Sequence, residues 1–127
     1  MITLNAEGVI DLPSPYPVVE TADRLQSLLL AKGMKIFARI DQAAEAASVG
    51  MTLRPTILLL FGNPKGGTPL MEQFPSLAID LPLKALIWES TDKVYLSFVS
   101  PEYLQRRHHL PMTPFAQIPE LFAAALK

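Results

Sequence analysis

The sequence predicts an α+β domain of two layers, with helices packed mainly on one face of a mixed sheet of about five strands. Segments with strand and helix patterns alternate along the chain. The last two strand segments follow each other directly, as in an antiparallel hairpin. The chain has 127 residues, of which 50% are apolar, enough for one hydrophobic core. We therefore expect residues 1–127 to form a single domain.

Five segments have the composition or the period of β-strands. They are residues 8–12, 34–41, 56–61, 82–89 and 93–99. Prolines soon after the first segment place it at a sheet edge, because proline cannot donate to a strand ladder. The second segment alternates apolar and polar residues and predicts a strand with one apolar face. The third is apolar throughout, which predicts a central strand buried on both faces.

Five further segments predict helices. They are residues 18–32, 42–49, 68–74, 101–108 and a C-terminal segment that starts at 114 or 119 and ends at 126. Gly33 ends the first helix, and Asp41 is placed to cap the second. Thr68 and Pro69 have the residue types of an N-cap and a first helical position, as do Ser100 and Pro101.

Composition excludes several classes of function. A net charge of −1 argues against a nucleic-acid-binding protein that neutralises phosphates. The absence of cysteine excludes disulfides, iron–sulfur clusters and thiolate zinc sites. The N-terminus lacks the pattern of a signal peptide, and no apolar run reaches the ~20 residues of a membrane helix. We expect a soluble cytoplasmic protein without contact to nucleic acid or membrane, with no predicted metal site and no identifiable cofactor.

The first candidate site is a glycine-rich segment, residues 62–68, predicted as a loop that leaves the central strand and enters a helix. Glycines allow successive backbone N–H groups to converge, and a lysine and the helix N-terminus add positive charge. These features favour a small anionic ligand. The predicted ligand-binding residues of this segment are Gly62, Asn63, Lys65, Gly66, Gly67 and Thr68. The alternative is a tight turn that caps a helix and leaves the lysine in solvent.

The second candidate is a pair of carboxylates at strand boundaries, Asp41 and Asp80. If both flanked the glycine-rich segment, one could act as a general base, or the two could share a metal. The alternative assigns Asp41 to helix capping and Asp80 to a turn or to an ion pair with Lys84.

The third candidate lies near the end of a predicted helix, where Arg106, Arg107, His108 and His109 follow one another. Cations at this position complement the helix dipole. The functional alternative is that Arg107 binds an anion while His108 transfers a proton or binds a metal.

Four motifs follow in order along the chain. They are residues 37–41 (FARID), 61–71 (FGNPKGGTPLM), 79–84 (IDLPLK), and Tyr103-Leu104 with Arg107-His108. In this order they resemble DUF302, a bacterial and archaeal family of unknown function, over about residues 17–110. The resemblance implies a small two-layer α+β domain, commonly dimeric, with no established activity.

Two residues depart from the family pattern. Gln42 stands where the family typically has a histidine, so a metal site beside Asp41 lacks that imidazole. His109 stands where the family often has glycine. The C-terminal tail, residues 111–127, lies outside the part of the chain that resembles the family.

Three functions follow from these observations. The leading hypothesis is a homodimeric domain that binds a small anion on residues 62–68, with Arg107 and His108 nearby. The second is a hydrolase or isomerase in which Asp41 or Asp80 is the base and His108 the acid. The third is a dimeric protein-interaction module without a ligand, in which the glycine-rich segment serves only the fold.

Overall fold

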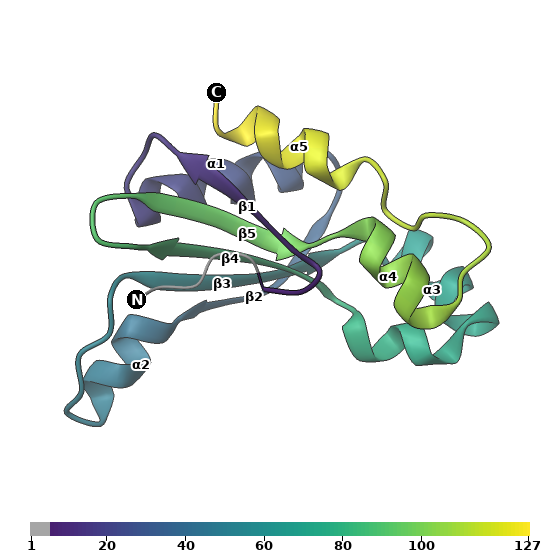
Figure 1. Ribbon diagram of the computed structural model, residues 1–127, viewed down its shortest axis with the longest axis horizontal. Coiled ribbons are helices and arrows are strands. Elements are labelled where there is room, and N and C mark those ends of the chain that lie inside the picture. Colours follow the sequence, from purple (N-terminus) through teal and green to yellow (C-terminus); the bar gives the residue numbers. More distant parts are fainter. Residues whose placement is uncertain (1–5) are drawn as a thin grey trace.

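The computed structural model describes residues 6–127, and within them one five-stranded sheet of order β1-β5-β4-β3-β2 (Figure 1). The strands are β1 (Val9–Ser14), β2 (Lys35–Asp41), β3 (Thr56–Gly62), β4 (Leu83–Glu89) and β5 (Val94–Val99). The helices are α1 (Val18–Ala31), α2 (Gln42–Ser48), α3 (Pro64–Gln73), the 3-10 helix η1 (Pro75–Asp80), α4 (Pro101–His108) and α5 (Ile118–Ala125). No helix within residues 6–127 combines the length and the hydropathy of a membrane-spanning segment.

The predicted α+β class is confirmed, but the predicted mixed sheet is wrong, because each pair of neighbouring strands within residues 6–127 is antiparallel. The alternating directions mean that β1 and β2 run the same way. However, α1 carries the chain across the whole sheet, so these two strands occupy opposite edges with three strands between them. A local pattern of strand, helix and strand therefore does not produce a parallel pair here.

The hydrophobic core lies between one face of the sheet and the two helices α1 and α5, which run side by side (Figure 1). Leu25 and Leu29 of α1 and Phe122 of α5 are fully buried in it. The Phe122 ring lies 5.6 Å from the ring of Phe61 in β3 and 4.8 Å from that of Phe98 in β5. The C-terminal tail is thus part of the core. The apolar residues whose spacing predicts its helix form the face that packs against the sheet.

Both edge strands differ from their predicted form. β1 continues through Pro13 to Ser14, which is possible because an edge strand needs partners on one side only. In β2 a bulge between Ile36 and Ala38 shifts the pairing with β3. Ile36 lies opposite buried Phe61, whereas Ala38 lies opposite Leu60 on the other face. The prediction that the apolar residues of β2 share one face is therefore wrong beyond Ile36.

The sheet face opposite α1 and α5, here called the open face, is mainly apolar but uncovered by these helices. It carries Ile40, Leu58, Leu60, Leu86, Trp88, Tyr95 and Val99. The prediction that β3 is buried on both faces is only half right, because Leu58 and Leu60 stay half-buried while Leu59 is fully buried. An antiparallel sheet normally has polar residues on its solvated face, so this face departs from the usual pattern.

Strand direction separates the remaining helices into two groups at opposite ends of the sheet (Figure 1). α2 follows β2 directly and projects from one end, with no buried residue. α3, η1 and α4 gather at the other end, where α3 and α4 both pack against η1. The candidate residues must therefore be considered end by end.

Gly8 is required where the chain enters β1. Its φ is +75°, and an added Cβ would lie 2.5 Å from Cγ of the Tyr103 ring. Gly33 has a similar φ of +81° but nothing within 4 Å. We expect Gly33→Ala to lower the free energy of unfolding by about 1 kcal/mol, the cost of a left-handed alanine. Gly8→Ala should cost at least about 1 kcal/mol more, because a packed ring must also move. Urea unfolding measures both, and equal losses would contradict the Tyr103 contact.

Candidate functional site

The glycine-rich segment is the first turns of α3 and not a loop, because the helix begins at Pro64. Asn63 is its N-cap, and the Asn63 side-chain oxygen accepts from the Lys65 N–H at 3.0 Å. The predicted cap at Thr68 is wrong, since Thr68 lies inside the helix. Gly66 and Gly67 are poor helix formers and obscure the sequence pattern of a helix start. Asn63-Pro64 is nevertheless an N-cap followed by proline at the first helical position, as is Ser100-Pro101.

In the first turn of α3, the backbone N–H groups that the sequence predicts to bind an anion already have hydrogen-bond acceptors. The N–H groups of Gly66 and Gly67 both donate to the Asn63 carbonyl oxygen, at 3.0 Å and 2.8 Å. The Lys65 N–H is held by the Asn63 side chain. The three amides therefore do not converge on an open site, and what remains of the predicted cradle is the exposed Lys65 side chain.

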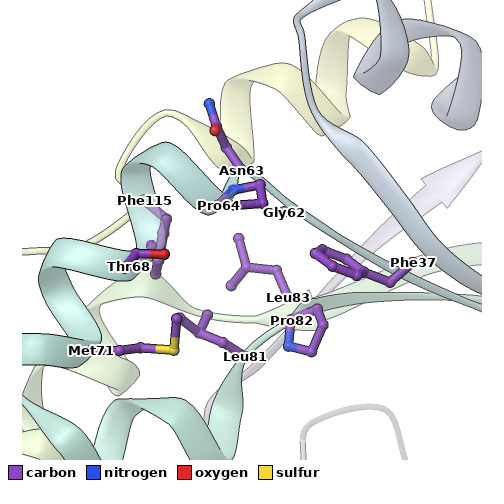
Figure 2. Close-up of a pocket in the computed structure, with 11 residues that line it drawn as sticks. Phe37, Gly62, Asn63, Pro64, Thr68, Met71, Leu81, Pro82, Leu83 and Phe115 are labelled. Atoms are coloured by element: carbon purple, nitrogen blue, oxygen red, sulfur yellow. The ribbon is translucent and has the colours of Figure 1, made fainter.

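The same segment forms one wall of a cavity of about 310 Å³ (Figure 2). α3 faces the start of β4 across it, and β2 and the chain before α5 complete the wall. Most of the lining is apolar, from Phe37, Met71, Leu81, Leu83 and Phe115. Thr68 adds a hydroxyl that points into the cavity, whereas the Asn63 side chain points away from it (Figure 2).

Two backbone features keep this cavity open. Gly67 is buried, and an added Cβ would lie 3.7 Å from Leu81 Cδ1 and 3.9 Å from Met71 Cε, so its missing side chain leaves space. Phe115 has a φ of +55°, which is rare for a bulky residue and costs on the order of 1–2 kcal/mol. Strain of this kind is found most often at functional sites, and here it holds an aromatic ring at the cavity wall.

A polar cluster forms where η1 meets α4. One oxygen of Asp80 accepts from Arg107 Nε at 3.0 Å and lies 2.5 Å from His108 Nε2. The other ring nitrogen, His108 Nδ1, lies 2.8 Å from the Ser76 hydroxyl oxygen. The Asp80 carboxylate raises the pKa of Arg107, and interaction with Tyr103 raises it further. The cluster therefore joins a fixed positive charge, a carboxylate, an imidazole and a hydroxyl.

Asp41 takes no part in this cluster. It caps α2, where its carboxylate accepts from the Ala44 N–H at 2.9 Å, as predicted. It lies opposite Ile57 at the start of β3, whereas Asp80 precedes the β4 residues that pair with Phe61 at the end of β3. Four residues of strand at ~3.3 Å each, with the turns beyond, separate the two carboxylates by well over 10 Å. The hypothesis that they share a metal is therefore wrong.

The structure therefore divides the predicted site residues into three groups. Asp80, Arg107 and His108 come together, the residues of the glycine-rich segment line or flank the cavity, and Asp41 stands apart. The expected partner of Asp80, Lys84, instead donates to the Pro82 carbonyl oxygen. Within residues 6–127, no three His, Asp or Glu side chains gather as metal ligands would.

Ser76 is the residue that sequence reasoning misses. It lies in η1, beyond the predicted end of the preceding helix, and 32 positions before the histidine it contacts. No local pattern indicates that contact. His109 is the left-handed C-cap of α4, with a φ of 54°, and its position after the helix explains why glycine would suit it.

With the geometry established, comparison with known proteins identifies the family. A family model described as "Domain of unknown function DUF302" matches residues 10–125. The chain belongs to the DUF302 family. The match is longer than the 17–110 predicted and includes α5, in agreement with the burial of Phe122.

Three curated relatives, each 37% identical over 114 residues, share 89% of this chain. They are "Fluoride-specific ion channel FluC 1" of Brucella suis and of Brucella abortus, and "Fluoride-specific ion channel FluC 2" of Brucella melitensis. The chain spans less than half of their length, 45% in the first and 42% in the others.

A solved structure shows the same fold. It is the crystal structure of an uncharacterized conserved DUF302 protein from Bacillus stearothermophilus, with a TM-score of 0.80 and 18% identity. The superposition covers 95% of this chain and 97% of that one. The two proteins therefore share one fold over nearly the whole of both chains.

The two candidate aspartates should differ sharply in their effect on stability. Asp80→Ala removes the acceptor of two side chains, one of them the nearly buried imidazole of His108, whose side chain is 4% exposed. We expect this variant to lose about 1–3 kcal/mol of unfolding free energy. Asp41→Ala removes only the cap of a projecting helix and should cost about 0.5–1 kcal/mol. Urea unfolding decides, and the reverse order would show that the cluster does not hold α4 to η1.

Proposed function

We propose that this domain binds a small, mainly apolar molecule in the cavity between α3 and the start of β4. The observation that carries the proposal is the cavity itself, about 310 Å³ with walls that are mostly apolar side chains. That volume lies in the range of small-molecule sites, which combine apolar walls with a few placed polar groups.

The lining suggests how a ligand would be held. Phe37 is 44% exposed on β2 and faces the cavity from the side opposite Thr68 (Figure 2). A ligand that covers this ring removes apolar surface from water, which stabilises the complex by about 25 cal/mol per Å². The Thr68 hydroxyl would bond one polar group and fix the orientation of the ligand.

An anionic ligand, the function predicted from the sequence, has less support at this site. The amides of the α3 start are paired, Lys65 does not line the cavity, and Arg107 already pairs with Asp80. A charge placed among apolar side chains without new donors would carry a desolvation cost. The names of the Brucella relatives nevertheless make fluoride an anion worth testing.

Cyclohexanemethanol, cyclohexanecarboxylate and sodium fluoride separate the apolar ligand from the anion, because the first two share one apolar group and differ in charge. We expect the alcohol to bind, with amide NMR shifts confined to α3 and the start of β4. Gly67→Ala places a methyl group in the cavity and should weaken binding roughly threefold to fourfold, about one CH₂ of lost contact.

Gly66→Ala is the matched control, because it changes the same helix by the same substitution and meets nothing within 4 Å. Binding should stay unchanged in this variant. If the alcohol shifts no cavity resonance, or if only the carboxylate or fluoride binds and Lys65→Ala abolishes that binding, the apolar-ligand proposal is wrong.

A second function, self-association through the open face, is favoured by the apolar run of β3. Two of its three leucines, Leu58 and Leu60, point to the open face and are only half-buried. Two charged residues, Asp11 and Lys84, share this face, and each already has a partner: Asp11 accepts from the Ser97 hydroxyl, and Lys84 donates to the Pro82 carbonyl oxygen. Five strands of about six residues span roughly 24 by 20 Å, or about 480 Å² in projection. This is less than the ~800 Å² that each partner of a standard dimer buries, so the face suits a weak dimer.

A second copy of the chain is the partner that this chemistry fits, because a mainly apolar face that carries one carboxylate and one ammonium group can be complementary to itself under two-fold symmetry. Val99 lies on the open face and is 41% exposed, so Val99→Lys should fold normally. We expect it to raise the dimer dissociation constant at least tenfold in light scattering after gel filtration, because it buries a charge in each copy. Leu30→Lys, at an exposed position on α1, is the control. A monomeric wild type would contradict the interface.

A further inference from the structure

The imidazole of His108 has a different partner on each nitrogen. Nε2 lies 2.5 Å from an Asp80 carboxylate oxygen, and Nδ1 lies 2.8 Å from the Ser76 hydroxyl oxygen. A carboxylate can only accept, so in the neutral ring the proton is on Nε2 and Nδ1 is free to accept from the serine O–H. Ser76, His108 and Asp80 are thus hydrogen-bonded in series as a nucleophile, a general base and a carboxylate that orients the base.

The three groups differ in solvent exposure in the way that nucleophilic catalysis needs. Ser76 is exposed on η1, whereas the His108 side chain is 4% and the Asp80 side chain 27% exposed. The hydroxyl that would attack thus faces solvent, and the base behind it is shielded. Arg107 Nε lies 3.0 Å from Asp80 and adds a further link between α4 and η1.

We propose that Ser76 is a nucleophile activated by His108 and Asp80, and that the domain hydrolyses carboxylic esters. This activity is independent of ligand binding in the cavity, although Leu81 of the cavity wall directly follows Asp80 in the chain. Nδ1 of His108 is the general base in this arrangement. Either imidazole nitrogen can act as a base when the other nitrogen carries the proton.

The reaction balances with water as the only co-reactant. Ser76 Oγ bonds to the ester carbonyl carbon while its proton passes to His108 Nδ1. The bond from the carbonyl carbon to the alkoxy oxygen breaks, and the leaving alcohol takes that proton. A water then attacks the acyl-serine and gives a proton to His108, which returns it to Ser76 as the carboxylic acid departs. Asp80 accepts from His108 Nε2 throughout and stabilises the imidazolium.

Fluorophosphonate labelling of the full chain, read by peptide mass spectrometry, tests the nucleophile. Ser48 is the matched control, since it is also exposed and its hydroxyl donates to the Glu45 carbonyl oxygen. We expect label on Ser76 and not on Ser48. Hydrolysis of p-nitrophenyl acetate should show a burst of one product per chain and fall at least 100-fold in His108→Gln, the scale of a lost general base. The neighbouring His109→Gln should leave it unchanged.

A single-thiol variant separates catalysis from a purely structural role. The chain has no cysteine, so Ser76→Cys and Ser48→Cys each carry one thiol. Beside an imidazole a thiol ionises more readily. We expect Ser76→Cys to react with iodoacetamide near neutral pH at least tenfold faster than Ser48→Cys, and the advantage to vanish with His108→Gln. Absence of label on Ser76, or equal alkylation rates of the two thiols, would overturn the proposal.

Discussion

The packing of Phe61 against Phe122 fixes the end of the molecule where the candidate sites lie. Phe61 is fully buried, lies opposite Leu83 at the start of β4, and is one residue before Gly62 at the end of β3. The cavity lies between α3, which follows β3, and the segment that leads into β4. Because Phe122 belongs to the last helix, the C-terminal segment stabilises a site built from the middle of the chain.

The cavity and the polar cluster meet at one peptide bond. Leu81 lines the cavity, and the preceding residue, Asp80, holds Arg107 and His108. Apolar and charged environments are therefore adjacent without being mixed. The buried side-chain nitrogens and oxygens of residues 6–127 all have partners, so the cluster is satisfied before any ligand arrives. Such an arrangement is preorganised, and a bound molecule need not reorder it.

Sequence periodicity predicts most of the elements, because apolar spacing and capping residues are local signals. The order of elements, the cap at Asp41 and the start of α4 at Pro101 all follow from such signals. Strand direction does not, since it depends on where α1 delivers the chain across the sheet. The family resemblance adds the general fold but not the positions of individual contacts.

The errors at the site have physical causes of the same kind. Gly66 and Gly67 lower the helix propensity of α3, yet the helix forms, with Asn63 as its N-cap and Pro64 at its first position. The contact of Ser76 with His108 and the separation of Asp41 from Asp80 are properties of the assembled sheet ends. Local propensity identifies residues with reactive groups, while tertiary structure decides which of them meet.

The form of the two edge strands limits how this sheet can grow. Pro13 has no N–H to offer a further strand beside β1, and the bulge in β2 interrupts the regular ladder at the opposite border. Extension into a longer intermolecular sheet, the usual route from a β-rich domain to a fibril, is thereby discouraged on both sides. The domain can therefore leave leucines on one sheet face while its two edges disfavour edge-to-edge association.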